Sequence, residues 1–377
     1  MDRSDEIGVS DGRSGSPKPR IVWLTSIESF IANYYFPEFS SSFKMRLAPL
    51  SLPLNRRLQT LSVLLTASFF FICTAMLLVC LMNPWTYPLL FPYFLWIALD
   101  AAPDRGGRRS MWLRQWTFWC FMRDFFPCQL VLDTDPSEFH ADRNYIMGYH
   151  PHGIIATGLW LNFCTEANSI SKRLPQLQIH PLTLSSNLRV PFWREMLLSA
   201  GLCSVDRSSM EYMLRPGTSG QALILVPGGA REALDAHPGQ YRLTLKSRLG
   251  FIKMAIRTGA DLVPVFAFGE TDLFCQVPNA HGSFLRQWQH YFLKNVGFAP
   301  CLPYGRGVFN YDYGLLPRRR RLVTVIGRPI RMDHQEACPS LETVLKYQRL
   351  YMEELQRIFD KYKDEFIPDR QGELELQ

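Results

Sequence analysis

One stretch of the chain, residues 58–99, contains no charged side chain. Within it, the run LSVLLTASFFFICTAMLLVCLM at 61–82 is long enough to cross the ~30 Å hydrocarbon core of a bilayer as a helix. Asn83 and Pro84 end that helix, because proline lacks a backbone donor and favours a turn. A second apolar run at 85–99 is shorter and is interrupted by prolines. The pattern predicts an N-terminal transmembrane hairpin.

Basic residues flank this apolar region on both sides. Arg56 and Arg57 precede its start, and Arg105, Arg108 and Arg109 follow its end. Because positive charge is retained on the cytosolic side, both ends of the hairpin are expected there. The alternative is one spanning helix followed by a buried core helix.

The segments around the hairpin differ in character. Residues 1–20 are rich in serine, glycine and charge, which is typical of disorder, and they lack the apolar core of a signal peptide. The stretch 111–131 mixes aromatic residues with charge, which predicts an amphipathic helix on the membrane surface or an ordinary core helix. The expected organisation is a polar N-terminal region at 1–46, a membrane hairpin at 47–110, a connector at 111–139 and a catalytic domain at 140–377.

Beyond residue 140, short apolar runs alternate with helical patterns. This alternation is typical of an α/β domain with a mixed, largely parallel sheet and flanking helices. The strand candidates are 145–149, 181–186, 202–205, 222–226, 262–268 and 322–327, and the helix candidates are 154–172, 191–200, 208–214, 242–258 and 342–366.

Residues capable of chemistry follow several of these strands directly. His150, Pro227-Gly228-Gly229 and Gly269-Glu270 each come just after an apolar run. In open α/β sheets, ligands bind at the carboxyl ends of the strands. We therefore expect a catalytic site at this edge.

Composition narrows the class of protein. The net charge is +7 and the sequence pI is near 8.9, which suits anionic ligands or an anionic membrane surface. No nucleic-acid-binding signature occurs, so no nucleic-acid partner is expected. The chain also lacks a P-loop, G-x-G-x-x-G and H-E-x-x-H, the motifs of common nucleotide-binding proteins and zinc proteases.

The segment YHPHG suggests acid–base chemistry. Imidazole titrates near neutrality, so His150 or His152 could take a proton from an alcohol that attacks a carbonyl. Glu232 could orient the base, and Gly228 and Gly229 could present backbone N–H groups to an oxyanion. Alternatively, the histidines satisfy buried hydrogen bonds, and Glu232 is a first-turn glutamate favoured by the helix dipole. A metal pair would need further ligands that the sequence does not indicate.

Several blocks of the chain resemble a known family. They extend over about residues 47–368, and the pairing of H-P-H-G with R-x-G-F-x-K-x-A is the most specific. The chain resembles the type-2 diacylglycerol acyltransferase family, which includes monoacylglycerol and wax-ester acyltransferases. The matching blocks are GGRRS (106–110), FFP (125–127), NYIMGYHPHG (144–153), RVPFWRE (189–195), VPGGAREAL (226–234), RLGFIKMAIRTGADLVPVFAFGE (248–270) and GRG (305–307).

The resemblance implies a glycerol-phosphate-acyltransferase-like fold and an endoplasmic-reticulum membrane enzyme, also found on lipid droplets, whose catalytic domain faces the cytosol. It implies acyl transfer from acyl-CoA to a glyceride hydroxyl, with no metal or other cofactor. One departure is Phe125, where members of the family often have tyrosine. The implied catalytic residues are His150, His152 and Glu232, and the expected substrate-binding residues are Gly153, Arg194, Gly228, Gly229, Arg248 and Lys253.

The acceptor stays open at this point. Diacylglycerol is the first expectation, with monoacylglycerol and a long-chain alcohol as alternatives, because the motifs are common to all three activities. A catalytically silent lipid-binding or scaffold protein on the same fold is a further alternative, although the intact motifs argue against it. The expected partners are acyl-CoA, the acceptor and the lipid bilayer, and a homo-oligomer is left open.

Overall fold

The computed structural model describes residues 46–49, 51–280, 282–297 and 300–377. The polar region predicted at 1–46, including the disorder expected at 1–20, lies outside the described residues except for Arg46.

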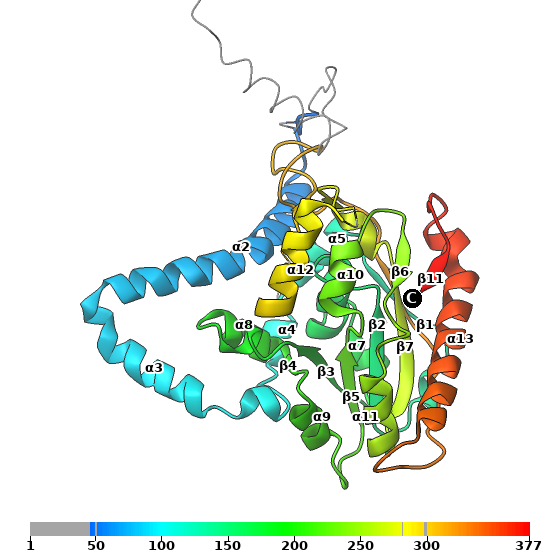
Figure 1. The fold of residues 1–377 in the computed structure, drawn as a ribbon. Helices are drawn as coiled ribbons and strands as arrows, with labels where there is room; N and C mark the ends of the chain where they lie inside the picture. The colour runs from blue at the N-terminus through cyan, green and yellow to red at the C-terminus, as the bar shows by residue number, and fades with distance from the viewer. Residues whose placement is uncertain (1–45, 50, 281, 298–299) are drawn as a thin grey trace, which may run out of the picture. The chain divides into compact units, whose positions relative to one another are not determined.

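A seven-stranded sheet forms the centre of the fold (Figure 1). Its spatial order is β1-β10-β7-β2-β5-β3-β4. The last five strands in that order are parallel to one another, whereas β10 is antiparallel to β7 and parallel to β1. The predicted mixed, largely parallel sheet is confirmed. The strands are β1 (Gln129–Leu132), β2 (Tyr145–His150), β3 (Gln178–Thr183), β4 (Cys203–Ser204), β5 (Gln221–Leu225), β7 (Asp261–Phe268) and β10 (Val323–Ile326).

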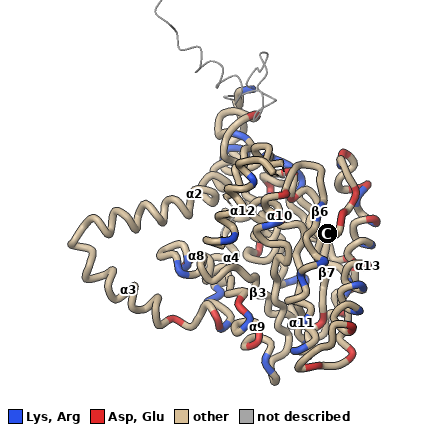
Figure 2. The backbone as a smooth tube through the Cα atoms, in the orientation of Figure 1, with Lys and Arg blue, Asp and Glu red and all other residues tan. Residues whose placement is uncertain are grey.

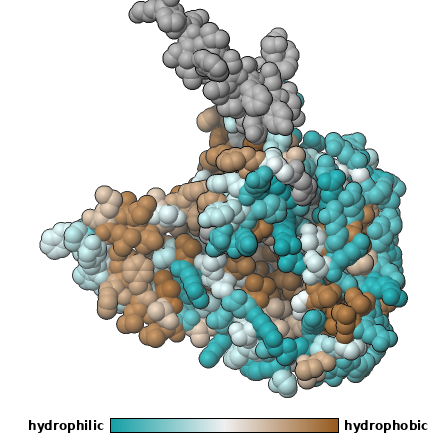
Figure 3. Space-filling model, in the orientation of Figure 1, coloured by the Kyte–Doolittle hydropathy of each residue, from teal (hydrophilic) through white to brown (hydrophobic). Residues whose placement is uncertain are grey.

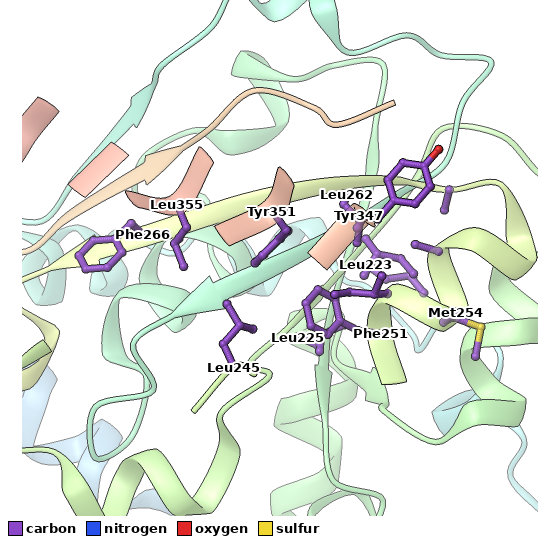
Figure 4. Close-up of a cluster of buried hydrophobic side chains, with 14 of the residues drawn as sticks. Leu223, Leu225, Leu245, Phe251, Met254, Leu262, Phe266, Tyr347, Tyr351 and Leu355 are labelled. Atoms are coloured by element: carbon purple, nitrogen blue, oxygen red, sulfur yellow. The ribbon is translucent and has the colours of Figure 1, made fainter. Parts of the chain in front are cut away.

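The central strands are buried on both faces, which explains their continuous apolar sequences. Every residue of β2 and of β7 is buried, as expected for parallel strands covered by helices on both sides. One core cluster joins the sheet to α13 (Leu341–Phe366) and α11 (Gly250–Thr258). Figure 4 shows Tyr351 and Leu355 of α13 facing Leu225 and Phe251 in this cluster.

The opposite face of the sheet packs against shorter helices. They include α6 (Thr157–Leu159), the π-helical turn Trp160–Cys164, α7 (Ile170–Arg173) and α8 (Trp193–Ala200). The remaining elements of the catalytic domain are α9 (Arg207–Met213), α10 (Gly229–Asp235), α12 (Phe284–Val296), β6 (Tyr241–Leu243), β8 (Cys275–Gln276), β9 (Pro303–Tyr304), β11 (Leu374–Leu376) and short 3₁₀ turns.

Three predicted helices differ from the observed elements. The stretch 154–172 is divided among α6, the π-helical turn and α7. The stretch 111–131 forms α4 (Met111–Arg114) and α5 (Thr117–Phe125) and then enters the sheet as β1, because Pro127 ends the helical pattern. Residues 242–258 begin in β6, and the helix there starts only at Gly250. The predicted C-terminal helix is confirmed as α13.

Two apolar helices precede this domain. α2 (Leu54–Met82) and α3 (Tyr87–Leu99) form a V whose tip is the 3₁₀ turn Pro84–Thr86, so the predicted break is confirmed (Figure 1). Apart from arginines in the first turn of α2, both helices lack charge, and hydrophobic side chains cover their surface (Figures 2 and 3).

The two helices differ in length and therefore in whether they can cross a membrane. Among the described residues, α2 is the one helix long and apolar enough to cross a membrane, and its 29 residues extend about 44 Å. α3 has 13 residues and extends about 20 Å, less than a full span. Leu89, Phe91 and Leu99 are exposed on α3. The alternative of a buried core helix after the spanning helix is therefore wrong.

Candidate active site

The H-P-H-G segment lies at the carboxyl edge of the sheet, between β2 and α6. His150 is the last residue of β2, which lies between β5 and β7. The chain segments that follow those two neighbours carry Glu232 and Glu270. The predicted convergence of strand ends is therefore present, and it brings two carboxylates to the histidine segment.

His150 is fully buried and bonded to the C-terminal helix. Its Nε2 lies 3.0 Å from the hydroxyl of Tyr351, and that hydroxyl donates to the carbonyl of Gly148 at 3.1 Å. Because a tyrosine has one proton to donate, Nε2 of His150 carries the hydrogen in this arrangement. Nδ1 is buried without a hydrogen-bond partner among the described residues. Burial lowers the pKa of His150 to about 3, so the ring is neutral.

His152 has a different environment, because it is only partly buried. Its Nδ1 lies 3.1 Å from the carbonyl oxygen of Gly153. A carbonyl can only accept, so Nδ1 carries the hydrogen and Nε2 keeps its lone pair. Burial lowers the pKa of His152, which keeps the lone pair available near neutral pH.

Glu232 holds the main chain of His152. Its carboxylate accepts from the backbone N–H of His152 at 3.1 Å and from that of Thr244 at 2.9 Å. Burial raises the pKa of Glu232 to about 7, against the opposite effect of those hydrogen bonds and of Arg248. The sequence suggested that Glu232 orients an imidazole; in the structure it fixes the backbone from which the imidazole projects. A Cβ at Gly228 would lie 1.8 Å from the carboxyl carbon of Glu232, so a side chain at this position would displace the carboxylate.

Glu270 holds the other end of the same loop. It accepts from the N–H groups of Thr157 at 2.6 Å and Gly158 at 2.9 Å, and from the hydroxyl of Tyr149 at 2.7 Å. Burial raises its pKa to about 7. A Cβ at Gly153 would lie 2.8 Å from the Cγ of Glu270, which explains the glycine after the second histidine.

Sequence reasoning missed two members of this arrangement. Glu270 had a signal, because it follows β7 directly, but it was not included among the site residues. Tyr351 had none, since it lies 201 positions after His150 and belongs to an ordinary apolar helix stripe.

The basic residues predicted to bind substrate do not form one cluster. Arg248 lies near Glu232, with Nη2 3.4 Å from the Gly228 carbonyl. Lys253 is exposed on α11. Gly229 begins α10 with a φ of +57° and open space at its Cβ position.

Arg194 has protein partners for its whole guanidinium. It is fully buried in α8 and bonds Asp100 at 2.5 Å, Glu195 at 2.8 Å and the Leu188 carbonyl at 2.8 Å. It also lines a cavity of about 430 Å³ where α3 ends. The cavity lining does not include His150, His152 or Glu232.

Within the described ranges, no group of three or more His, Cys, Asp or Glu side chains is placed to hold a metal ion.

Comparison with known proteins identifies the class of this site. The family model described as diacylglycerol acyltransferase matches residues 79–377. The chain therefore belongs to the diacylglycerol acyltransferase family, and the resemblance of its sequence motifs is confirmed. It is an enzyme of the acyltransferase class.

Individual relatives are similar over most of their length. The chain is 42% identical over 333 residues to "Diacylglycerol O-acyltransferase 2" of Dictyostelium discoideum, covering 88% of this chain and 99% of that protein. It is 42% identical over 319 residues to "Diacylglycerol O-acyltransferase 2" of Homo sapiens, covering 83% and 81%.

Among solved structures, the 1-acyl-sn-glycerophosphate (LPA) acyltransferase PlsC from Thermotoga maritima is 14% identical, with a TM-score of 0.36. The match covers 82% of this chain and 98% of that one, and it is too distant to support an argument.

Proposed function

We propose that this enzyme transfers a fatty acyl group from acyl-CoA to the free hydroxyl of diacylglycerol, giving triacylglycerol, with His152 as general base. The names of the relatives support the substrate class. The observation that carries the assignment of the base is the state of His152. Its Nδ1–H is fixed by the Gly153 carbonyl, and its Nε2 lone pair has no partner among the described residues.

In this mechanism, Nε2 of His152 accepts the proton of the acceptor hydroxyl as its oxygen attacks the thioester carbonyl. The carbonyl oxygen becomes negatively charged, and backbone N–H groups at Gly228 and Gly229 are the proposed donors to it. The tetrahedral intermediate then collapses, the carbon–sulfur bond breaks, and the CoA thiolate takes the proton from the imidazolium. This proton transfer returns His152 to its neutral form, so the reaction consumes no cofactor.

We assign His150 a supporting role. Its place directly after the strand would favour it slightly as the base. Its complete burial and its bond to Tyr351 favour His152 instead. His150 joins the end of β2 to α13 and so fixes the position from which the loop begins.

The donor is proposed to bind beside α11. Arg248 and Lys253 could pair with CoA phosphates. A side chain at Gly153 would meet Glu270, so this contact favours a role for the glycine in packing the loop and not in binding substrate. For Arg194, the bonds to Asp100 and Glu195 favour a structural role in joining α8 to the end of α3.

We further propose that α2 and α3 insert into the endoplasmic-reticulum membrane, with the catalytic domain in the cytosol and access to the surface of lipid droplets. Both substrates carry long acyl chains that partition into the bilayer. An anchored domain would therefore meet them at its membrane-facing edge.

The acceptor is tested with purified protein, radiolabelled oleoyl-CoA and three acceptors: diacylglycerol, monoacylglycerol and a long-chain alcohol. Products are resolved by thin-layer chromatography. We expect the highest rate with diacylglycerol. Faster labelling of wax ester or of diacylglycerol would assign another acceptor, and no labelling of any product would support the scaffold alternative.

A further inference from the structure

Helix α12 presents an unusual distribution of side chains, since its buried face is polar. Arg286 and Gln289 are 4% and 1% exposed. The guanidinium of Arg286 pairs with Asp235 at 2.5 Å and donates to the Leu234 carbonyl at 3.0 Å. Gln289 accepts from the side-chain amide of Asn279 at 3.1 Å. This network attaches α12 to the end of α10.

The outer face of α12 is aromatic. Phe284, Trp288 and Tyr291 are 83%, 38% and 64% exposed. Their spacing of four and three residues places them on one side of the helix. The ring of Phe292 lies 4.7 Å from that of Trp288 and extends the aromatic surface.

This polarity is the reverse of that expected for a helix on a soluble domain, where the apolar stripe faces the core. A helix with its aromatic side chains outward is stable when apolar material lies outside it. Tryptophan and tyrosine are the residues preferred where hydrocarbon meets water. We propose that the outer face of α12 lies on the surface of the bilayer, with Phe284, Trp288 and Tyr291 between the lipid headgroups.

Two further features favour a bilayer over a second copy of the chain as the occupant. Gln287, Lys294 and Asn295 are exposed beside the aromatic stripe, which suits a helix lying flat at the headgroup level. The chain also carries α2, which is long and apolar enough to cross a membrane. The inference rests on the proposed anchoring by α2 and assigns a second contact to the same membrane.

The contact would place the bilayer beside the site. α12 is bonded to α10 through Leu234 and Asp235, and α10 carries Glu232. A lipid acceptor diffusing in the membrane would then reach the enzyme at the carboxyl edge of its sheet.

The test is photocrosslinking of the full chain reconstituted into phosphatidylcholine vesicles. p-Benzoyl-phenylalanine replaces Trp288 in one variant and Tyr291 in a second, so that the result does not depend on one substitution. Phe71, 70% exposed on α2, is the position for the anchor. Tyr212 is the matched control, because its 39% exposure equals that of Trp288 within 1% and it lies on α9.

After irradiation, mass spectrometry of peptides identifies the adducts. We expect phosphatidylcholine adducts at 288 and 291, as at 71, and none at 212. Lipid at 71 without lipid at 288 or 291 would overturn the inference about α12 while leaving the anchor intact. Crosslinks from 288 to protein would also overturn it, in favour of a second copy. Absence of lipid at all three positions would refute the α12 contact and the anchor together.

Discussion

At the residue scale, two buried carboxylates hold the loop that carries the proposed base. Glu232 bonds the N–H of His152, and Glu270 bonds those of Thr157 and Gly158. An ionised carboxylate accepts at both oxygens, whereas a protonated one must donate from one of them. The loop is therefore held best when both groups are ionised.

Activity should respond to pH through these carboxylates. The pKa values of Glu232 and Glu270 are raised to about 7, so turnover is expected to fall as pH is lowered through about 7. The free energy of unfolding should change in the opposite direction and decrease as pH rises. A folded pKa raised from about 4.5 gives stability that is fully present below 4.5 and is lost as pH rises through about 7. Turnover and melting temperature measured from about pH 5 to 8 test both statements.

Glu270→Gln should reduce the slope of melting temperature against pH, because it removes one titrating group. Glu211→Gln is the control, since Glu211 forms an exposed ion pair with Arg207 and its pKa is lowered. A wild-type melting temperature that rises with pH over the same interval would contradict the account.

The hydroxyl of Tyr351 permits a test of the role of His150. Tyr351→Phe removes the partner of His150 Nε2 and should cost about 1–3 kcal/mol of stability, because a buried donor is left unpaired. Turnover at permissive temperature should change little, since His152 is the proposed base. Tyr347→Phe, on the same face of α13, is the control: its hydroxyl bonds Asp333 and not the site. A fall in turnover of about 10²-fold or more in Tyr351→Phe alone would favour His150 as the base.

At the scale of elements, the sequence predicts a helix or strand correctly where the hydrophobic residues of its pattern are the ones that the fold buries. β2, β5 and β7 are continuous apolar runs because both of their faces are covered. α12 was not predicted, since its aromatic side chains face outward while the polar Arg286 and Gln289 face inward. The strand after α5 was hidden because the apolar sequence continues across Pro127 into the run QLVL at 129–132.

Prediction of the candidate site from the sequence has the same limit. His150, His152 and Glu232 could be predicted as site residues because each stands in a local motif at a strand end. Tyr351 belongs to the site only through tertiary packing of α13, which no local pattern indicates. The preference for His152 over His150 likewise depends on burial and hydrogen bonding, which are properties of the folded chain.

The start of α10 gives a prediction at this scale. Gly228→Ala would place its Cβ 1.8 Å from the carboxyl carbon of Glu232, so the carboxylate must move and release the backbone of His152. We expect turnover to fall by about 10-fold or more, in proportion to the lost orientation of the base. Gly250→Ala at the start of α11 has no atom within 4 Å of the added carbon and should leave turnover unchanged. Equal turnover in the two variants would contradict the role assigned to Gly228.

At the scale of the whole molecule, the V of α2 and α3 is proposed to determine how the catalytic domain meets the membrane. Both arms are apolar, and basic residues stand in the first turn of α2 and after α3. α3 is too short for a full span, so the tip of the V is expected within the bilayer and the outer ends of both arms on its cytosolic side.

This arrangement predicts that the two termini are on the same side of the membrane. Tags at each end should both be digested by protease added to intact microsomes. A lumenal protein should stay protected as the control for sealed vesicles. Protection of one tag but not the other would show that the chain crosses the bilayer an odd number of times.

The central claim is that His152, and not His150, takes the proton of the acceptor hydroxyl. The most direct measurement is kcat with acyl-CoA and diacylglycerol for His152→Gln and His150→Gln, with the melting temperature of each. Glutamine keeps a polar side chain of similar reach but cannot act as a base near neutral pH. The account predicts that His152→Gln lowers kcat by about 10²–10⁴-fold with a nearly unchanged melting temperature. It predicts that His150→Gln mainly lowers the melting temperature. Near-normal turnover in His152→Gln would contradict the account.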